Sequence, residues 1–445
     1  MPSSEKPARV KPRIIIHGGA GNITRQNLPN KSYQAYRSAL LDILREARCM
    51  LSQPDATALD VATHAVTRLE NNALFNAGHG AVYTRDGTHE LEASVMVSRG
   101  YRKRDVGVMK IKRARNPILL AREMLIQGEK DDGGGAQGHC QLEGETCDRL
   151  ASEWGLELAK PSYFWTRRRW DEHRRALGLE HDNETYRKHK RDANSCSEDS
   201  EMPSEAEAAN GEDDMCAKDA SWDGEEYLPQ GTVGAVVLDS TGATCVATST
   251  GGITNKLPGR IGDTPTIGAG FWAEEWETTH FKPAKIPVQQ QSLTSLTSLV
   301  SDCLPGLSGY MPLSSPPVYD TQPKIVHSQR AVAMSGTGNG DSFLRLNAVR
   351  TAAAIACYSS STPLASGVYP LQTAVTSVAG PNGMLQQSAE DRWHVTGEGE
   401  GGIIGIDWQE DGEGNVVADF NCGGMFRAWV DDEGRERMAV FREEV

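Results

Sequence analysis

The residue with the most unusual setting in the sequence is Thr232. Gly231 and Thr232 follow a long charged stretch and open the alternating apolar run "GTVGAVVLD". Inside a chain, a threonine hydroxyl is a weak nucleophile because nothing nearby takes its proton. At a chain start, the free α-amine has a pKa of about 7.7–8.0 and can accept that proton. A break between the two residues would therefore give one residue both the attacking oxygen and the base. From these residues alone, an ordinary β-strand threonine at a loop exit stays the favoured interpretation.

Helices and strands are expected over residues 13–127, ahead of this threonine. Apolar residues recur at helical spacing at Leu40, Leu44, Ala47 and Leu51, and "LEASVMVS" alternates as a half-buried strand does. The expected elements are a strand from Arg13 ending in a glycine turn, a helix over 31–51, a helix from Thr57 with Asp60 at capping-box spacing, the strand 91–98 with 106–112 as its neighbour, and a helix with Asn116 as N-cap and Pro117 in its first turn.

A charged stretch separates this block from Thr232. Residues 167–191 are rich in Arg, Lys and His, and residues 195–226 are rich in Asp, Glu and Ser. Blocks of like charge bury little apolar surface, so we predict a disordered, exposed linker over 166–230. The basic half could be a nuclear-import or nucleic-acid patch, but the acidic half would screen it.

The second block begins at Thr232. Residues 232–239 and 243–250 flank a Ser-Thr-Gly turn and predict a hairpin. A polar stretch near 282–329 predicts a surface insertion. "SGTGNGD" then leads from a glycine turn into one helix with Phe343, Leu346, Val349 and Ala353 on one side, and closing strands are expected over 401–408, 415–421, 426–430 and 437–441.

Composition excludes several classes of protein. A formal net charge of −14 argues against a general nucleic-acid binder. The sequence contains no apolar run of about 18 residues, and its first residues lack the apolar core of a secretion signal. The nine scattered cysteines include no CxxC pair, which indicates reduced thiols, no zinc site, and a cytoplasmic or nuclear protein that is not secreted.

The order of the short motifs narrows the choice. Together they resemble the plant-type (type 2) L-asparaginase and isoaspartyl peptidase family of N-terminal nucleophile (Ntn) hydrolases. The resemblance covers 13–127 and 231–274 well and the part from Ser335 more loosely. The motifs are "HGGAG", "FNAGHG", "LEASVMV", "NPILLAREM", "GTVGAVVLD", "ATSTGG", "GRIGDTP" and "GAGFWAE".

The resemblance implies a self-cleaving precursor cut at Gly231–Thr232, with Thr232 as the nucleophile and, through its new amine, the base. Thr250 matches the threonine that holds the nucleophile's oxygen, although a plain strand-end threonine is the alternative. Glycine at 231 permits the strained backbone that attack on its own carbonyl requires.

By the same resemblance, Arg260 and Asp263 grip the free α-carboxylate and α-ammonium of the substrate, which suits a two-pronged cation and an anion. A turn-stabilising pair is the alternative for two such residues three apart. Thr337 and Gly338 match the oxyanion hole, where a glycine-rich helix cap is the alternative. Gly340 belongs to the implied substrate-binding residues.

Three further residues or segments carry weaker implications. Asn76 matches an asparagine near the nucleophile, and His17 is expected to be structural. In some members the loop around residues 69–79 binds sodium through backbone carbonyls; no other metal and no organic cofactor are implied.

The resemblance leaves the substrate open. It implies hydrolysis of the side-chain amide of L-asparagine, of β-aspartyl (isoaspartyl) peptides, or both, through an acyl-threonine ester that releases aspartate. "GTGNGD" departs from the usual "TTGHGE" and resembles the glycosylasparaginase branch, so N4-(β-N-acetylglucosaminyl)-asparagine is an alternative substrate. A threonine-aspartase-like protease is a further alternative, against which Asp263 argues. A non-enzymatic scaffold is the alternative from another class.

The expected architecture is an α+β fold with four layers, αββα, in a single Ntn-hydrolase domain over 1–445. Its expected parts are an α-subunit core over 13–165, the linker 166–230 and a β-subunit over 232–445. The family implies a dimer of cleaved αβ units, and we expect neither a nucleic-acid nor a membrane partner.

Overall fold

The computed structural model describes residues 10–180, 183–195, 231–282, 324–359, 370–410 and 412–444. The chain divides into two compact units. The first comprises Met1–Trp276 and Gln329–Val445, and the second Glu277–Ser328. In the second unit, the described residues are strand segments over 277–282 and 324–328, where Thr278 donates a hydrogen bond to the carbonyl oxygen of Ser328. All features below belong to the first unit unless stated.

An eight-stranded sheet puts Thr232 directly before a central strand. Its order is β12-β11-β1-β5-β6-β2-β3-β4, antiparallel except for the β3–β4 pair. The strands are β1 (Arg13–Gly21), β2 (Leu91–Val97), β3 (Asp105–Ile111), β4 (Gln141–Glu143), β5 (Val233–Leu238), β6 (Thr244–Thr250), β11 (Gly424–Val430) and β12 (Glu436–Ala439).

A second sheet has the order β10-β9-β8-β7. The end of β8, with Thr337 and Gly338, lies near the start of β5, as the hydrogen bond between Thr337 and Thr232 shows. Its strands are β7 (Phe271–Lys282), β8 (Lys324–Gly338), β9 (Gly401–Gln409) and β10 (Asn415–Phe420), of which β7 and β8 run on into the second unit.

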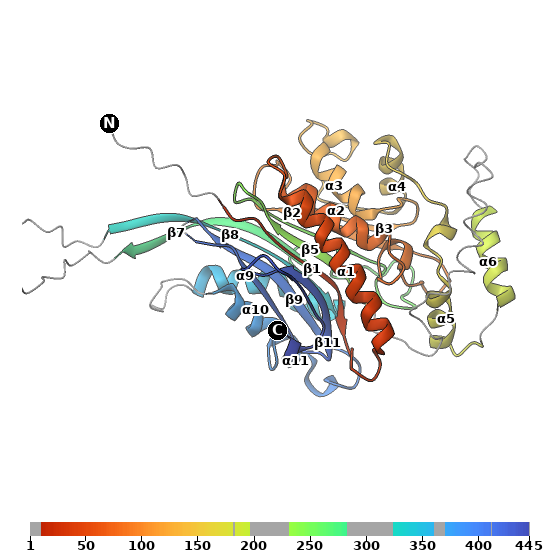
Figure 1. The fold of residues 1–445 in the computed structure, drawn as a ribbon. Helices are drawn as coiled ribbons and strands as arrows, with labels where there is room; N and C mark the ends of the chain where they lie inside the picture. Colours follow the sequence, from red (N-terminus) through yellow and green to blue (C-terminus); the bar gives the residue numbers. More distant parts are fainter. Residues whose placement is uncertain are drawn as a thin grey trace, which may run out of the picture. The chain divides into compact units, whose positions relative to one another are not determined.

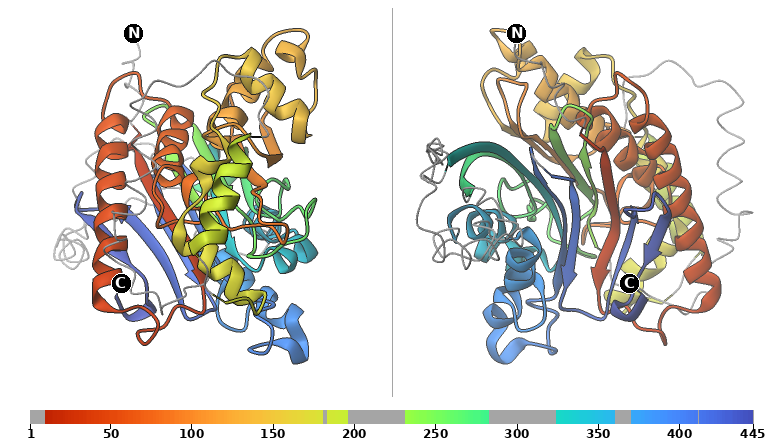
Figure 2. Two further views of the ribbon diagram at one scale, coloured as in Figure 1. Left: turned by 90° about the vertical axis from the view of Figure 1, so that its right-hand side faces the viewer. Right: turned by 60° about the vertical axis from the view of Figure 1, so that its left-hand side comes forward.

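Helices pack on both sheets (Figures 1 and 2). One apolar core joins the larger sheet to α1, α2, α3 and α4, and another joins the smaller sheet to α8, α9, α10 and α11. These helices are α1 (Asn30–Leu51), α2 (Ala58–Glu70), α3 (Pro117–Gln127), α4 (Gly144–Glu153), α8 (Gly340–Leu346), α9 (Ala348–Tyr358), α10 (Leu371–Ala379) and α11 (Met384–Ala389). Short 3-10 turns cover Gly78–Gly80, Gly133–Gly135, Pro161–Phe164, Glu390–Arg392 and Arg442–Glu444.

A third apolar core lies between the two sheets. Ile15, Val236 and Val246 of the larger sheet contribute to it together with Ile404 and Trp408 of the smaller one. The larger sheet therefore has apolar packing on both faces, and the fold is of the α+β class.

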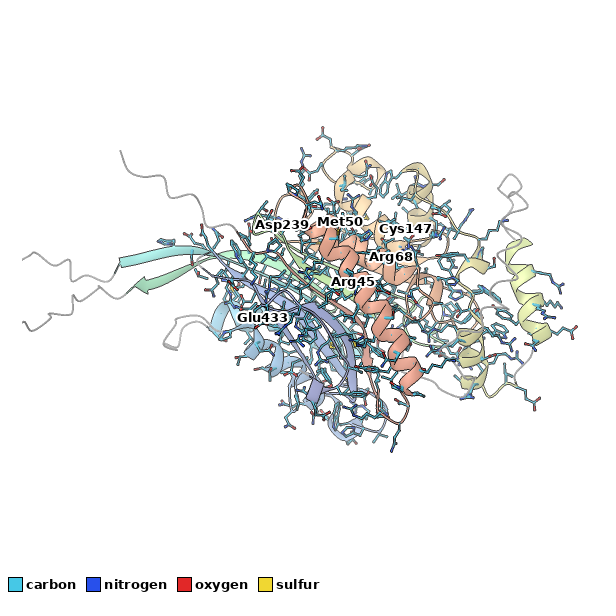
Figure 3. The ribbon with its side chains drawn as sticks, in the orientation of Figure 1. Arg45, Met50, Arg68, Cys147, Asp239 and Glu433 are labelled. Atoms are coloured by element: carbon cyan, nitrogen blue, oxygen red, sulfur yellow. The ribbon has the colours of Figure 1, made fainter. Side chains whose placement is uncertain are left out.

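The ends of α2 show how local chemistry fixes an element. The side chain of Thr57 accepts the backbone N–H of Asp60, as predicted. The carboxylate of Asp239, in the β5–β6 turn, accepts the backbone N–H of Ala58 and so ties the helix to the hairpin. Arg45 on α1 and Arg68 on α2 have their side chains on the exposed side of these helices (Figure 3).

Several predicted elements are confirmed. These are the glycine-ended first strand, the first helix with its four apolar positions buried, the β2–β3 pairing, the β5–β6 hairpin and the four closing strands.

Two local predictions are wrong, and a third is confirmed in position only. The strand over 91–97 is buried on both faces, because a helix layer and a second sheet cover it. Asn116 is the N-cap residue of α3 and Pro117 lies in its first turn, as predicted, but the Asn116 side chain makes no cap bond and instead donates to Glu70, whose carboxylate accepts the N–H of Ile118. The helix after the glycine turn is two helices, because Asn347 adopts a left-handed φ of 47° between them.

The predicted disordered linker over 166–230 is also wrong where it is described. Residues Arg167–Ala176 form α5 and Asn183–Ser195 form α6. Acidic side chains follow the arginines of α5 at helical spacing, so Arg167 pairs with Asp171 and Arg168 with Glu172. This neutralisation allows the charged helix to be buried. Residues 196–230, and the core of the predicted insertion over 283–323, lie outside the described residues.

Among the residues that the structure describes, no helix combines the length and the apolar character needed to cross a bilayer.

Candidate active site

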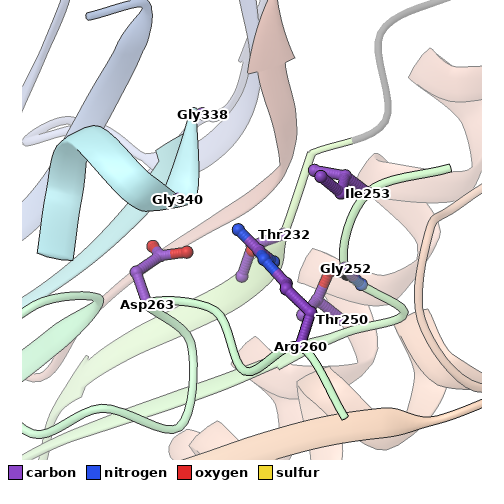
Figure 4. A pocket seen from close by; sticks show the side chains of 8 residues that line it. All are labelled: Thr232, Thr250, Gly252, Ile253, Arg260, Asp263, Gly338 and Gly340. Atoms are coloured by element: carbon purple, nitrogen blue, oxygen red, sulfur yellow. Dashed lines mark hydrogen bonds between the residues drawn. The ribbon is translucent and has the colours of Figure 1, made fainter. Parts of the chain in front are cut away.

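A pocket lies at the start of β5, where segments far apart in the sequence meet (Figure 4). Its walls come from the β5 start, the end of β6, the loop that follows β6, and the turn between β8 and α8. The lining residues are Thr232, Thr250, Gly252, Ile253, Arg260, Asp263, Gly338 and Gly340.

Thr232 lines this pocket, and its side-chain hydroxyl has a buried hydrogen-bond partner. Its Oγ1 lies 2.8 Å from Oγ1 of Thr264, a fully buried residue of the loop after β6. The backbone carbonyl of Thr232 accepts a hydrogen bond from Oγ1 of Thr337 at 3.0 Å. Both the side chain and the carbonyl of Thr232 therefore have a fixed partner in the uncut chain.

The bond before Thr232 is packed so closely that residue 231 must be glycine. A Cβ atom on Gly231 would lie 2.6 Å from the nitrogen of Ala20 and from the Cα of Gly19, and 2.7 Å from Oγ1 of Thr337. Gly19 itself has a φ of 118°, which favours glycine. The turn after β1 thus presses against the backbone ahead of Thr232.

Thr250 lines the pocket, and Asn76 supports the glycine turn that follows Thr250. The side-chain oxygen of Thr250 accepts the N–H of Gly252 at 3.1 Å. Asn76 does not line the pocket; its amide donates to the carbonyl of Gly252 at 2.7 Å and accepts the N–H of Val82 at 3.0 Å. Asn76 therefore supports the glycine turn from behind.

Arg260 and Asp263 bring opposite charges to the pocket, and each keeps an unsatisfied polar atom. Nε of Arg260 and Oδ2 of Asp263 are buried with no hydrogen-bond partner among the described residues. Nη2 of Arg260 lies 3.0 Å from the exposed carboxylate of Asp341. Burial raises the pKa of Asp263 to about 7, against a smaller opposing effect of the Arg260 charge. Figure 4 shows both side chains beside Thr232.

Two glycines of the pocket stand where a larger side chain would clash with its neighbours. A Cβ on Gly340 would lie 2.6 Å from Oδ1 of Asp263 and 3.0 Å from Nη2 of Arg260. Gly338 has a φ of 146°, and a Cβ there would lie 2.3 Å from the carbonyl oxygen of Glu400.

A buried ion pair anchors the loop that carries Arg260 and Asp263. Nζ of Lys256 lies 3.6 Å from the Glu92 carboxylate, and both side chains are almost fully buried. Glu92 also accepts the backbone N–H of Gly262 at 3.1 Å. These contacts hold the loop against β2.

His17 lies on β1, where it pairs with Gly234 of β5. Its Nε2 is 2.7 Å from Oγ of Ser335, and burial lowers the pKa of the imidazole to about 3, so the ring is neutral. A neutral, hydrogen-bonded ring agrees with the structural role expected of it.

The loop over 69–79 offers backbone oxygens that suit a hard cation. A Cβ on Gly78 would lie 2.4 Å from the carbonyl oxygen of Glu70, and one on Gly80 would lie 2.1 Å from that of Phe75 and 2.7 Å from that of Ala73. The sodium ion that the sequence resemblance implies in this loop stays a prediction. No cluster of His, Cys, Asp or Glu able to hold a metal ion occurs within the described residues.

The structure brings most of the sequence-predicted site residues to one pocket. Thr337 lies behind Thr232 and Asn76 behind Gly252, so neither lines the pocket itself. Sequence reasoning did not name Thr264, Gly252 or Ile253 as site residues. The hydroxyl directly after the "GRIGD" aspartate was the available signal for Thr264; nothing marked Ile253, an exposed apolar residue at the pocket edge.

Comparisons with known proteins show which family the chain resembles. A family model described as asparaginase matches residues 10–278. An isoaspartyl peptidase of Escherichia coli (strain K12) is 31% identical over 97% of this chain and 96% of its own length. An isoaspartyl peptidase of Salmonella typhimurium is 30% identical over 97% of this chain and 98% of its own length. A plant-type L-asparaginase of Pyrococcus furiosus is 35% identical over 59% of this chain and 70% of its own length.

Proposed function

Because the chain belongs to the asparaginase family, we propose that it is an amide hydrolase that releases aspartate from L-asparagine, from β-aspartyl peptides, or from both. Two of its relatives are named isoaspartyl peptidases and a third a plant-type L-asparaginase, which supports this choice of substrates. The proposal includes the four-layer αββα arrangement of Ntn hydrolases.

Maturation is the first step of the proposal. Oγ1 of Thr232 attacks the carbonyl carbon of Gly231, the acyl group moves from nitrogen to oxygen, and water hydrolyses the resulting ester. The products are a chain ending at Gly231 and a chain that begins with the amine of Thr232. The tight packing of Gly231 against Gly19 and Ala20 supports this step, because it limits the positions open to the scissile carbonyl.

Hydrolysis then uses the new terminus. Oγ1 of Thr232 attacks the substrate's side-chain carbonyl while its proton passes to the α-amine. The oxyanion that forms accepts a hydrogen bond from the Gly338 N–H and one from the Thr337 hydroxyl, which turns from the Thr232 carbonyl to the oxyanion in this step. The amine returns its proton to the leaving ammonia or peptide amine, which breaks the amide bond. Water then attacks the acyl-threonine ester, giving aspartate and restoring the free hydroxyl.

One observation carries the proposal: unsatisfied atoms of opposite charge flank the hydroxyl of Thr232. A free amino acid places an ammonium and a carboxylate on the same Cα, and Asp263 and Arg260 are the complementary partners. An endopeptidase substrate has neither free group, so this pocket favours the end of a peptide or a free amino acid.

The test compares wild type with Thr232→Ala on a denaturing gel and in an aspartate-release assay with L-asparagine and β-aspartyl dipeptides. We expect two fragments and turnover for the wild type, and one full-length chain without turnover for the variant. N-terminal sequencing of the second fragment should begin at Thr232. An uncut wild-type chain that still releases aspartate would overturn the proposal.

Three parts of the sequence-based expectation extend this proposal. A sodium ion held by the carbonyls of Glu70, Ala73 and Phe75 would fix the loop that carries Asn76. A dimer of cleaved units is expected, which light scattering of the purified protein tests. A cytoplasmic or nuclear location is expected from the cysteine usage.

A further inference from the structure

The hydroxyl of the proposed nucleophile has a partner that the family motif does not assign to it. Oγ1 of Thr232 lies 2.8 Å from Oγ1 of Thr264. The expected partner, Thr250, instead uses its hydroxyl to accept the N–H of Gly252. Because Thr264 is fully buried, its hydroxyl does not exchange this partner for bulk water.

Thr264 is itself held in place by two strands of the larger sheet. Its carbonyl oxygen accepts hydrogen bonds from Oγ of Ser94 at 2.7 Å and from Oγ1 of Thr248 at 3.4 Å. Ser94 on β2 and Thr248 on β6 face each other across the ladder and are hydrogen-bonded together. Gly234 of β5 pairs with Thr248 in the same ladder, so the strand after Thr232 shares this support.

The same loop segment also carries the substrate-binding carboxylate, since Asp263 directly precedes Thr264. The backbone N–H of Thr266 donates to the carbonyl of Asp263 at 3.0 Å, and the N–H of Gly262 donates to Glu92. The loop therefore fixes the substrate ammonium partner and the nucleophile's partner with one backbone.

Resting on the function proposed above, we propose that Thr264 is a positioning residue for the nucleophile. A threonine side chain has three staggered χ1 positions, and a fixed hydrogen-bond partner selects one of them. Thr264 holds the attacking oxygen of Thr232 in one position, both for cleavage ahead of residue 232 and for attack on substrate. Loss of this partner leaves the oxygen free to occupy positions from which attack is slow; a displacement of about 1 Å can cost about 10²-fold in rate.

The test uses the full-length chain with Thr264→Val, which keeps the shape and removes the hydroxyl, and Thr264→Ser, which keeps the hydroxyl. A gel time course gives the rate of self-cleavage, and steady-state kinetics of the cleaved enzyme give kcat and KM. We expect Thr264→Val to lower the cleavage rate and kcat by about 10- to 100-fold with KM within about threefold of wild type. Thr264→Ser should recover most of both rates.

Thr266→Val is the matched control in the same loop. The hydroxyl of Thr266 donates to the carbonyl of Gly262 at 2.8 Å, and within the described residues it makes no hydrogen bond to Thr232. Equal rate losses in Thr264→Val and Thr266→Val would overturn the inference, since the loop alone would then be responsible. A Thr264→Val variant that cleaves and turns over like wild type would overturn it too.

Thr264→Ala keeps the test valid if the valine variant does not fold, as judged by its melting temperature. A cleaving, active Thr264→Ala with wild-type kcat would contradict the proposal. Failure of the proposed function looks different: there the wild type itself stays uncut or inactive, whatever residue stands at 264.

Discussion

The helix α5 and the active-site pocket both bury arginine and carboxylate side chains, yet they treat them differently. In α5, the guanidinium of Arg169 is 1% exposed and bonds to the Glu172 carboxylate at 2.9 and 3.1 Å and to the carbonyl of Gly80 at 2.7 Å. In the pocket, Nε of Arg260 and Oδ2 of Asp263 find no partner within the described part of the chain.

In α5 both charges are satisfied within the chain, whereas in the pocket Arg260 pairs, among the described residues, only with the exposed Asp341 carboxylate and each side chain keeps one unsatisfied atom. A buried charge without a partner is costly, so a fold retains one where something else compensates for it. In α5 the compensation comes from within the chain. In the pocket, an incoming amino acid would supply it with its own ammonium and carboxylate.

Asp263→Asn tests the pocket pair of Arg260 and Asp263, and it should give the largest effect on activity. The variant keeps the shape but loses the negative charge, so kcat/KM for L-asparagine should fall about 10²- to 10³-fold. Its stability should change in the opposite sense. The folded pKa of Asp263, about 7, lies above the ordinary 3.8, so the ionised carboxylate destabilises the fold as pH rises from about 4 to 7.

Thermal melting at pH 8 measures that second effect. The melting temperature of Asp263→Asn should exceed that of the wild type at pH 8, and the gap should close near pH 4. A variant that loses both activity and stability at pH 8 would mean that Asp263 is one of the charges that stabilise the fold.

Arg169→Met tests the buried Arg169–Glu172 ion pair of α5. The variant leaves Glu172 buried without one of its cations, so the free energy of unfolding should fall by about 3 kcal/mol. Urea denaturation followed by fluorescence gives this value. Arg45→Met is the matched control, since Arg45 pairs with Asp42 and Glu436 at the exposed surface of α1. Equal losses in the two variants would show that the α5 pair has no special weight.

The pH dependence of ligand binding should show a smaller effect. A protonated Asp263 does not attract an ammonium, so the affinity for L-aspartate should weaken about tenfold between pH 8 and pH 6. Calorimetry in buffers of different ionisation enthalpy should detect a proton released on binding below pH 7. In Asp263→Asn the same titration should be nearly independent of pH, whereas an unchanged pH profile would assign the proton to another group.

Sequence reasoning found the pocket because its residues stand in short, ordered motifs. Thr232, Arg260 and Asp263 were named from such motifs, and the structure brings them together. Thr264 was not named, because its partner depends on how the loop after β6 folds back onto β5. No local pattern records a contact between side chains 32 residues apart.

The α5 helix shows where reasoning from composition fails. A run of charged residues predicted disorder, but "RRRWDE" places acids four residues after arginines, which is the spacing of neighbours on a helix. Trp165 and Trp170 in the same stretch pack with Tyr83 and Tyr186 in a buried aromatic cluster. Spacing within the run, rather than its total charge, carried the structural information.

The strand order gives a break ahead of Thr232 an unusual consequence. Strands β5 and β6, from the later piece, lie between β1 and β2, from the earlier piece, while β11 and β12 close the far side of β1. In the larger sheet, strands of the two pieces therefore alternate and neither piece holds that sheet alone, whereas the smaller sheet belongs entirely to the later piece. An affinity tag on either piece should recover both in equal amounts under native conditions, because separating them would break the β1–β11, β1–β5 and β2–β6 strand pairings.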